Sequence, residues 1–288
     1  MHALAVFAAV TASAGIWLWY VRRYDKVEPE PLKTLLRVGL LGGLMSVFLA
    51  GIFNSIFIVV TGIDMEKAPV VELAILALFI GFNEEIMKAL AAIVMVRKLD
   101  DFNEPIDGLI YGMTVALGFA ALENIQYIAQ YGLGVIVTRT LLSVPGHLFY
   151  AALWGYGLSK AKFMTREQRY FRTALPYIAG AALLHALYDF LLFTGTAAAV
   201  LVLPLLVVLL VITHKRLNWM AGQSVFLQSG ECPSCRGGNQ PGAAFCGWCG
   251  ADLQQIFYHV CPGCGAKTDA RAGFCPKCGA RFENITRT

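Results

Sequence analysis

Seven long apolar runs constrain this chain more than any other feature of its sequence. Most are long enough to cross roughly 30 Å of hydrocarbon as a helix. Only 15% of the 288 residues are charged, against roughly 25% in soluble domains, so a soluble globular fold is excluded. We therefore expect an all-α polytopic membrane protein with about seven transmembrane helices. The runs cover residues 3–21, 35–60, 70–96, 105–131, 133–158, 175–193 and 197–212.

The positive residues between these runs predict the orientation of the chain. Alternate connections give one side of the membrane fourteen Lys and Arg residues and the other side only Lys67 and Arg139. We expect the positive side to be cytoplasmic, with the N-terminus outside a cell membrane and the tail inside. The alternative for the first run is a signal peptide, but Arg22 and Arg23 follow that run instead of preceding it, which favours an anchor.

The tail holds all eight cysteines, in two copies of the pattern Cys-x2-Cys-x10-Cys-x2-Cys. Two such pairs supply the four thiolates of a structural zinc site, and a cytoplasmic compartment disfavours the alternative of disulfides. We predict a double zinc ribbon with two structural Zn²⁺ ions and four cysteines per zinc. The ligands are Cys232, Cys235, Cys246 and Cys249 in the first ribbon, and Cys261, Cys264, Cys275 and Cys278 in the second.

The composition also predicts the domain boundaries. Residues 1–216 form a transmembrane domain whose polar motifs lie between 70 and 193, and residues 217–230 form a linker. The two zinc ribbons cover residues 231–252 and 260–283. The net charge of +4 is modest, so no specific nucleic-acid partner is expected.

Several ionisable residues interrupt the apolar runs, where each charge costs roughly 2.5–3.5 kcal/mol. They are Glu84, Glu85 and Lys88 in the third run, Glu123 in the fourth, His147 in the fifth, and His185 with Asp189 in the sixth. Glu84, His147 and His185 each lie thirteen residues from the positive residue at the cytoplasmic end of their run. All three are therefore expected roughly 20 Å from that boundary, and this shared depth argues for one site.

These residue types are compatible with three classes of function. Carboxylates and imidazoles can activate a water for hydrolysis or hold a zinc-bound water. The same groups can instead relay protons or ions in a coupled transporter. A non-catalytic scaffold, whose zinc ribbons bind a cytoplasmic protein partner, is the third alternative. The membrane part contains no cysteine, which excludes a thiol nucleophile there.

Four motifs, in order on four runs, resemble those of PrsW-family intramembrane proteases, within the superfamily of CAAX proteases and Abi proteins. They are Glu84-Glu85-x-x-Lys88, Phe119-x-x-x-Glu123, His147 and His185-x-x-x-Asp189. The segments 106–112, 118–124 and 155–157 are also similar. In the wider superfamily the second motif typically ends in His and the last in Asn, so Glu123 and Asp189 favour the PrsW branch.

The resemblance implies an intramembrane endopeptidase that cleaves a membrane-embedded, anti-sigma-factor-like protein in the lipid bilayer. It assigns Glu84 as the general base that activates water. Glu85 projects about 100° away around the helix, so we assign it, with Lys88, to positioning. His185, oriented by Asp189, would hold the water or the oxyanion, and His147 and Glu123 would complete the site. Whether a catalytic metal takes part is left open by the sequence.

Overall fold

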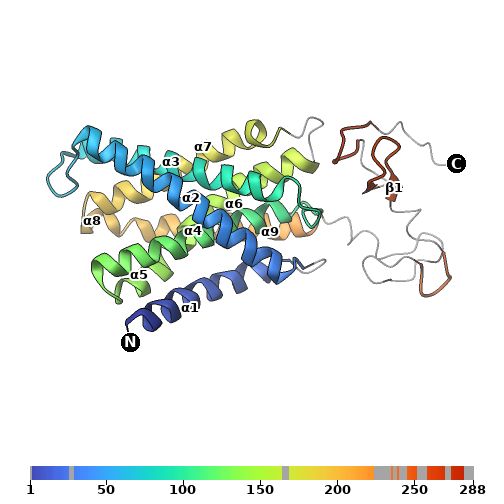
Figure 1. The fold of residues 1–288 in the computed structure, drawn as a ribbon, viewed down its shortest axis with the longest axis horizontal. Coiled ribbons are helices and arrows are strands. Elements are labelled where there is room, and N and C mark those ends of the chain that lie inside the picture. The colour runs from blue at the N-terminus through green and yellow to red at the C-terminus, as the bar shows by residue number, and fades with distance from the viewer. Residues whose placement is uncertain are drawn as a thin grey trace.

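A computed structural model describes residues 2–25, 29–163, 169–223, 235, 239, 245–251, 258–269 and 274–281. Nine helices lie in these described ranges, and most of them run roughly along one direction (Figure 1). They are α1 (His2–Arg22), α2 (Leu32–Thr61), α3 (Val70–Val96), α4 (Asp107–Tyr131), α5 (Val135–Leu141), α6 (Ser143–Phe163), α7 (Tyr170–Phe193), α8 (Thr196–Ala199) and α9 (Val202–Ala221).

Six helical stretches in the described ranges are long and apolar enough to cross a membrane, and two of them combine a short helix with the longer one that follows. Helix α3 is a further helix of spanning length, with 27 residues, but it carries Glu84, Glu85 and Lys88 in its interior. The prediction of an all-helical membrane protein with about seven spanning helices is confirmed. Helix α9 continues through Ala221, so the first residues of the predicted linker are helical.

The fifth apolar run, which we expected as one helix over residues 133–158, is broken into two. Helix α5 ends at Leu141 and α6 begins at Ser143. Pro145 is the physical reason, because its ring clashes with the carbonyl four residues earlier, which belongs to Leu141. Helix α5 lies beside the end of α4 (Figure 1).

Helix α4 is the centre of the bundle. In its most apolar window 72% of the residues are buried, compared with 17% in α1 and α2. Glycines allow the backbones of neighbouring helices to touch α4. A Cβ added at Gly118 of α4 would lie 1.9 Å from the carbonyl oxygen of Gly39 on α2. A Cβ added at Gly108 of α4 would lie 2.6 Å from the carbonyl oxygen of Gly155 on α6. Such contacts are typical of membrane bundles, where van der Waals packing replaces the hydrophobic effect between helices.

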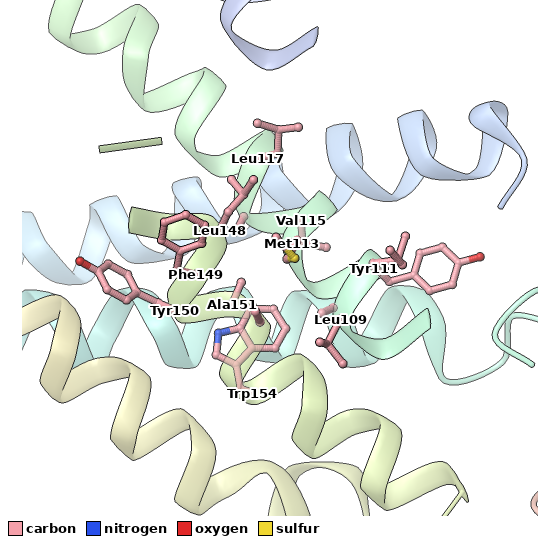
Figure 2. Close-up of a cluster of buried hydrophobic side chains, with 14 of the residues drawn as sticks. Leu109, Tyr111, Met113, Val115, Leu117, Leu148, Phe149, Tyr150, Ala151 and Trp154 are labelled. Atoms are coloured by element: carbon pink, nitrogen blue, oxygen red, sulfur yellow. The ribbon is translucent and has the colours of Figure 1, made fainter. Parts of the chain in front are cut away.

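Apolar side chains fill the space between α4 and α6 (Figure 2). Trp154 of α6 is fully buried, and a Cβ added at Gly112 of α4 would meet its ring at 3.0 Å. This packing fixes the indole where its N–H can reach a carboxylate of α3.

The tail contains the strands β1 (Tyr258–Val260) and β2 (Lys267–Asp269), which pair antiparallel with His259 opposite Thr268. Three cysteine turns have the same hydrogen bonds: the amide of Cys246, Cys261 or Cys275 donates to an alanine carbonyl five residues on. In each turn a glycine with positive φ follows the second cysteine: Gly250, Gly265 and Gly279. The duplicated sequence pattern is therefore a duplicated local structure.

Candidate active site

The seven ionisable residues predicted from the apolar runs lie in one network built from α3, α4, α6 and α7. Glu84, Glu85, Lys88, His147 and His185 are buried, and the side chains of Glu123 and Asp189 are 16% and 14% exposed. The structure thus brings together residues that are up to 105 positions apart in the sequence.

Glu85 and Lys88 form the buried centre of this network. The ammonium of Lys88 donates to Glu85 Oε1 at 2.6 Å and lies 4.3 Å from the ring centroid of Phe119. The indole of Trp154 donates to the other oxygen of Glu85 at 2.9 Å. A buried ion pair needs this full set of partners to offset its desolvation.

The contacts of His147 determine its tautomer. Lys88 Nζ lies 3.0 Å from Nδ1, and because an ammonium can only donate, Nδ1 is the acceptor. The protonated nitrogen is therefore Nε2, which donates to Glu123 Oε2 at 3.0 Å. In this state His147 links the centre of the network to Glu123.

His185 is oriented by a different residue from the one we expected. Its Nδ1 lies 2.9 Å from Glu85 Oε1, and since an ionised carboxylate only accepts, Nδ1 carries the proton. Asp189 Oδ2 lies 3.6 Å from Nε2, which is beyond hydrogen-bond distance. Glu85, rather than Asp189, thus holds the imidazole, and its unprotonated Nε2 lies on the side of Glu84 and Asp189.

Glu84 is the least satisfied carboxylate of the network. Its Oε1 accepts a long hydrogen bond of 3.4 Å from Asn54 of α2. Its Oε2 is buried and has no hydrogen-bond partner among the described residues, although Lys88 Nζ lies 3.5 Å away and His185 Nε2 3.9 Å away. A buried oxygen left in this way has room for a water or a ligand atom.

Sequence reasoning missed the residues that hold Glu84 in place. Asn83 donates to Asn54 Oδ1 at 2.7 Å and to the carbonyl of Ala50 at 2.9 Å, which turns the Asn54 amide nitrogen toward Glu84. A lone asparagine in an apolar span is the signal that could have found Asn54, because amides are costly in hydrocarbon without a partner.

Arg139 was also missed, because the orientation argument counted it only as a positive residue on the outer side of the membrane. It lies on α5 and is buried. Its guanidinium donates to Glu123 Oε2 and to Asn124 Oδ1, both at 2.5 Å, and its Cζ lies 3.7 Å from the centroid of Tyr127. The break before α6 is what lets α5 carry this arginine to the site.

A cavity of about 450 Å³ opens onto the network. Six helices supply its walls, and Glu84, Glu123, Arg139, His147, His185 and Asp189 lie along it with apolar residues of α2 and α7. Glu85 and Lys88 do not line it, and their positioning role stays a prediction. The volume is within the usual range for ligand sites.

The tail cysteines lie in two clusters. Cys261, Cys264, Cys275 and Cys278 form one, and Cys235, Cys246 and Cys249 form the other, with the predicted ligand Cys232 outside the described residues. Sulfur–sulfur distances are 3.4–3.6 Å, close to the roughly 3.8 Å edge of a tetrahedral site with 2.3 Å Zn–S bonds. The clusters are consistent with the ions of a zinc ribbon, and no disulfide joins the seven described cysteines.

A bundle of spanning helices encloses a cavity lined by carboxylates and imidazoles, an arrangement that suits an intramembrane protease. The chain matches the description "PrsW family intramembrane metalloprotease" over residues 30–213 and "Double zinc ribbon" over residues 232–279. The chain therefore belongs to the PrsW family, which decides against the transporter and scaffold alternatives.

Three curated relatives carry the name Protease PrsW. The protein of Geobacillus kaustophilus (strain HTA426) is 33% identical over 193 residues, covering 65% of this chain and 80% of the relative. Those of Clostridioides difficile (strain 630) and Bacillus subtilis (strain 168) are each 31% identical, covering 68% and 65% of this chain and 82% and 83% of the relatives. No solved structure matches the chain significantly.

The family description implies a metal, and the residues of the site fit one. Glu84, His147 and His185 each offer a ligand atom within 4.8 Å of the others, and two imidazoles with a carboxylate are common ligands of catalytic zinc. Glu84 Oε2 is the orphaned atom in this set. Both nitrogens of His147 are hydrogen-bonded, so binding through this residue requires the loss of one of those contacts.

Proposed function

We propose that this protein hydrolyses a peptide bond of a membrane-anchored protein with a water that Glu84 activates. The single observation that carries the proposal is Glu84 Oε2, a buried carboxylate oxygen without a hydrogen-bond partner among the described residues, on a residue that lines the cavity. General bases act through such an atom when a water can lie within hydrogen-bond reach.

The roles of the other residues follow from their contacts. Glu84 takes a proton from the water, whose oxygen attacks the carbonyl carbon of the scissile peptide. The unprotonated Nε2 of His185 accepts the water's other hydrogen and so aims it. When the C–N bond breaks, Glu84 returns the proton to the leaving amine. Glu85, Lys88 and Glu123 hold the two imidazoles in their tautomers and do not touch the reacting atoms.

A divalent metal held by Glu84, His147 and His185 would, when bound, polarise the attacking water or the scissile carbonyl. The formal charges of the network favour a bound cation. Its four carboxylates are balanced by only two permanent cations among the described residues, Lys88 and Arg139. The roles of Glu84 and His185 above describe the site without the ion, because a bound ion would occupy the same carboxylate and imidazole; Glu85, Lys88 and Glu123 would position the imidazoles in either case.

The test is the substitution Glu84→Gln, with Glu72→Gln as a matched control on the same helix, because Glu72 lies in the first turn of α3 and does not line the cavity. Comparative proteomics of membranes from cells carrying each variant should reveal a membrane protein that stays intact only with Glu84→Gln. Purified enzyme should lose about 10²–10⁴-fold in rate on that substrate. Equal cleavage by the two variants would refute the proposal.

We also propose that the cytoplasm lies at the end of the bundle where α3 ends and α4 begins, with the zinc ribbons on that side. The imbalance of positive residues supports this orientation. It places Glu84 roughly 20 Å from the cytoplasmic boundary, so water should reach the site from outside and the cut should fall in the outer half of the substrate's span.

Cysteines introduced singly between Val70 and Val96, probed with a membrane-impermeant thiol reagent, would check this depth. Labelling from outside should reach positions near Gly81 and stop short of Val94. Labelling near Glu84 from the cytoplasmic side alone would contradict the orientation. An anti-sigma-factor-like substrate, which the family resemblance implies, is anchored in the membrane and suits this geometry.

A further inference from the structure

Helix α2 packs tightly on α4 along its first half, and the two helices separate along its second half. At the crossing point, a Cβ added at Gly43 would lie 2.4 Å from the backbone of Gly118. Residues of α2 up to Ala50 alternate between buried and exposed, whereas residues 51–61 are all partly or fully exposed. Figure 1 shows α2 and the α4–α5 pair spreading apart toward the end of the bundle that carries α5.

The cavity occupies the space between these diverging helices. One face of α2 lines it, with Val47, Gly51, Ser55 and Ile58 at helical spacing, and Gln126 of α4 and Thr138 of α5 line it across from α2. Gly51 and Ser55 are exposed as well as lining the cavity. A Cβ added at Gly51 would meet no atom within 4 Å, so the cavity is open sideways at this point.

We propose that this lateral opening, formed by Gly51 and Ser55 of α2 with Gln126 of α4 and Thr138 of α5, admits the spanning segment of the substrate, and that the space at Gly51 receives a substrate side chain next to the scissile bond. The inference rests on the proposed peptidase function and names the route and subsite by which its substrate reaches Glu84.

Two observations point to a peptide as the occupant. The first is that Glu84, which lines the same cavity, has a buried carboxylate oxygen without a hydrogen-bond partner among the described residues. The second is the polarity of the opening. A peptide bond becomes accessible to water only when its helix unwinds, and the freed N–H and C=O groups then need partners inside the membrane. The hydroxyl and amide groups of Ser55, Gln126 and Thr138 supply such partners, whereas a lipid acyl chain cannot form hydrogen bonds with them.

The test uses a reporter protein made from the membrane span of the substrate that the Glu84→Gln comparison identifies. This span is placed between two soluble tags, and the reporter is reconstituted in liposomes together with the full-length enzyme. The reporter residues that flank the cut are changed in turn to Ala, Leu and Phe. The enzyme variant is Gly51→Phe, and Gly15→Phe is its matched control, because Gly15 of α1 is also exposed and free of neighbours within 4 Å but does not line the cavity.

Gly51→Phe should lower the cleavage rate of the Leu and Phe reporters by about 10-fold or more, and that of the Ala reporter much less. Gly15→Phe should cleave all three reporters as fast as the unsubstituted enzyme. Equal loss on every reporter, or none beyond that of Gly15→Phe, would overturn the proposed subsite. A reporter that Glu84→Gln still cleaves would instead overturn the proposed function.

A second measurement does not depend on the folding of Gly51→Phe. A photo-crosslinking amino acid replaces Ser55 in the Glu84→Gln protein, and another replaces Gly15 as the control. Adducts with the reporter from position 55 and not from position 15 support the lateral opening. Adducts of position 55 with lipid alone would show that the opening is only a lipid-facing groove, and the proposal would fail.

Discussion

At the residue scale, the site divides into groups that face the cavity and groups that hold them. Glu84 and the Nε2 of His185 face it with unused hydrogen-bonding capacity, while Glu85 is fully engaged by Lys88, His185 and Trp154. The two adjacent glutamates therefore have different environments, although the sequence presents them as a pair.

The orientation of His185 by Glu85 leads to the first prediction. Glu85→Gln should cost more activity than Asp189→Asn, because it weakens the 2.9 Å contact to Nδ1 and removes the closer of the two carboxylates paired with the Lys88 ammonium. Breaking a buried ion pair costs about 3–5 kcal/mol. Cleavage rates per folded enzyme, with thermal unfolding in detergent, would measure both effects. If Asp189→Asn proved more damaging at equal stability, Asp189 would act on the water or a metal directly.

Arg139 carries the second prediction. Arg139→Gln should lower both stability and kcat, because Glu123 would lose its cation and could no longer hold His147 in one position. Arg139→Lys should recover only part of the activity, since lysine keeps the charge but cannot contact Glu123 and Asn124 together through a planar fork. Full activity in Arg139→Gln, measured as kcat and KM on the same reporter, would show that Glu123 needs no partner.

At the element scale, close helix contacts set the distances within the site. Helices α3 and α7 touch at Gly81, where an added Cβ would lie 2.6 Å from the carbonyl oxygen of Ala182. This contact is one turn from Glu85 and His185 and brings their side chains within hydrogen-bond reach. The break between α5 and α6 has a similar consequence for Arg139.

The third prediction concerns this contact. Gly81→Val should force α7 away from α3 and lower activity by about 100-fold, since a displacement of about 1 Å at a catalytic group costs that much. Gly180→Val is the control, because Gly180 is on α7 but has no neighbour within 4 Å of its added Cβ. Similar activity and melting temperature in the two variants would mean that the α3–α7 distance is not limiting.

At the scale of the whole molecule, two parts are held together by different physics. The membrane domain relies on close packing of small residues and on a polar network that is hydrogen-bonded at its centre. The described part of the tail has two short strands and a few turns, so we expect metal binding to supply most of its folding free energy, as is usual for zinc ribbons.

The fourth prediction is the metal content of the full-length protein. Two zinc ions per chain should be bound by the tail, and the double substitution Cys275→Ser with Cys278→Ser should remove one of them. Elemental analysis of protein purified in detergent would count the ions, with Glu84→Gln as a control that leaves the tail zinc unchanged. Retention of both ions in the double variant would contradict the second site. Loss of an additional ion in Glu84→Gln would identify the membrane metal.

The sequence alone determined most of the helices, the membrane class and the cysteine turns, because hydrocarbon thickness and metal geometry act on residues close together in the chain. It also identified the seven polar residues, since charge inside an apolar run is costly wherever the run lies. It could not find Asn54 or Arg139, nor assign the partner of His185. Those contacts depend on how the helices pack against one another, which only the tertiary structure shows. Helices approach closely at Gly81 and Gly118, and the break next to Pro145 separates α5 from α6.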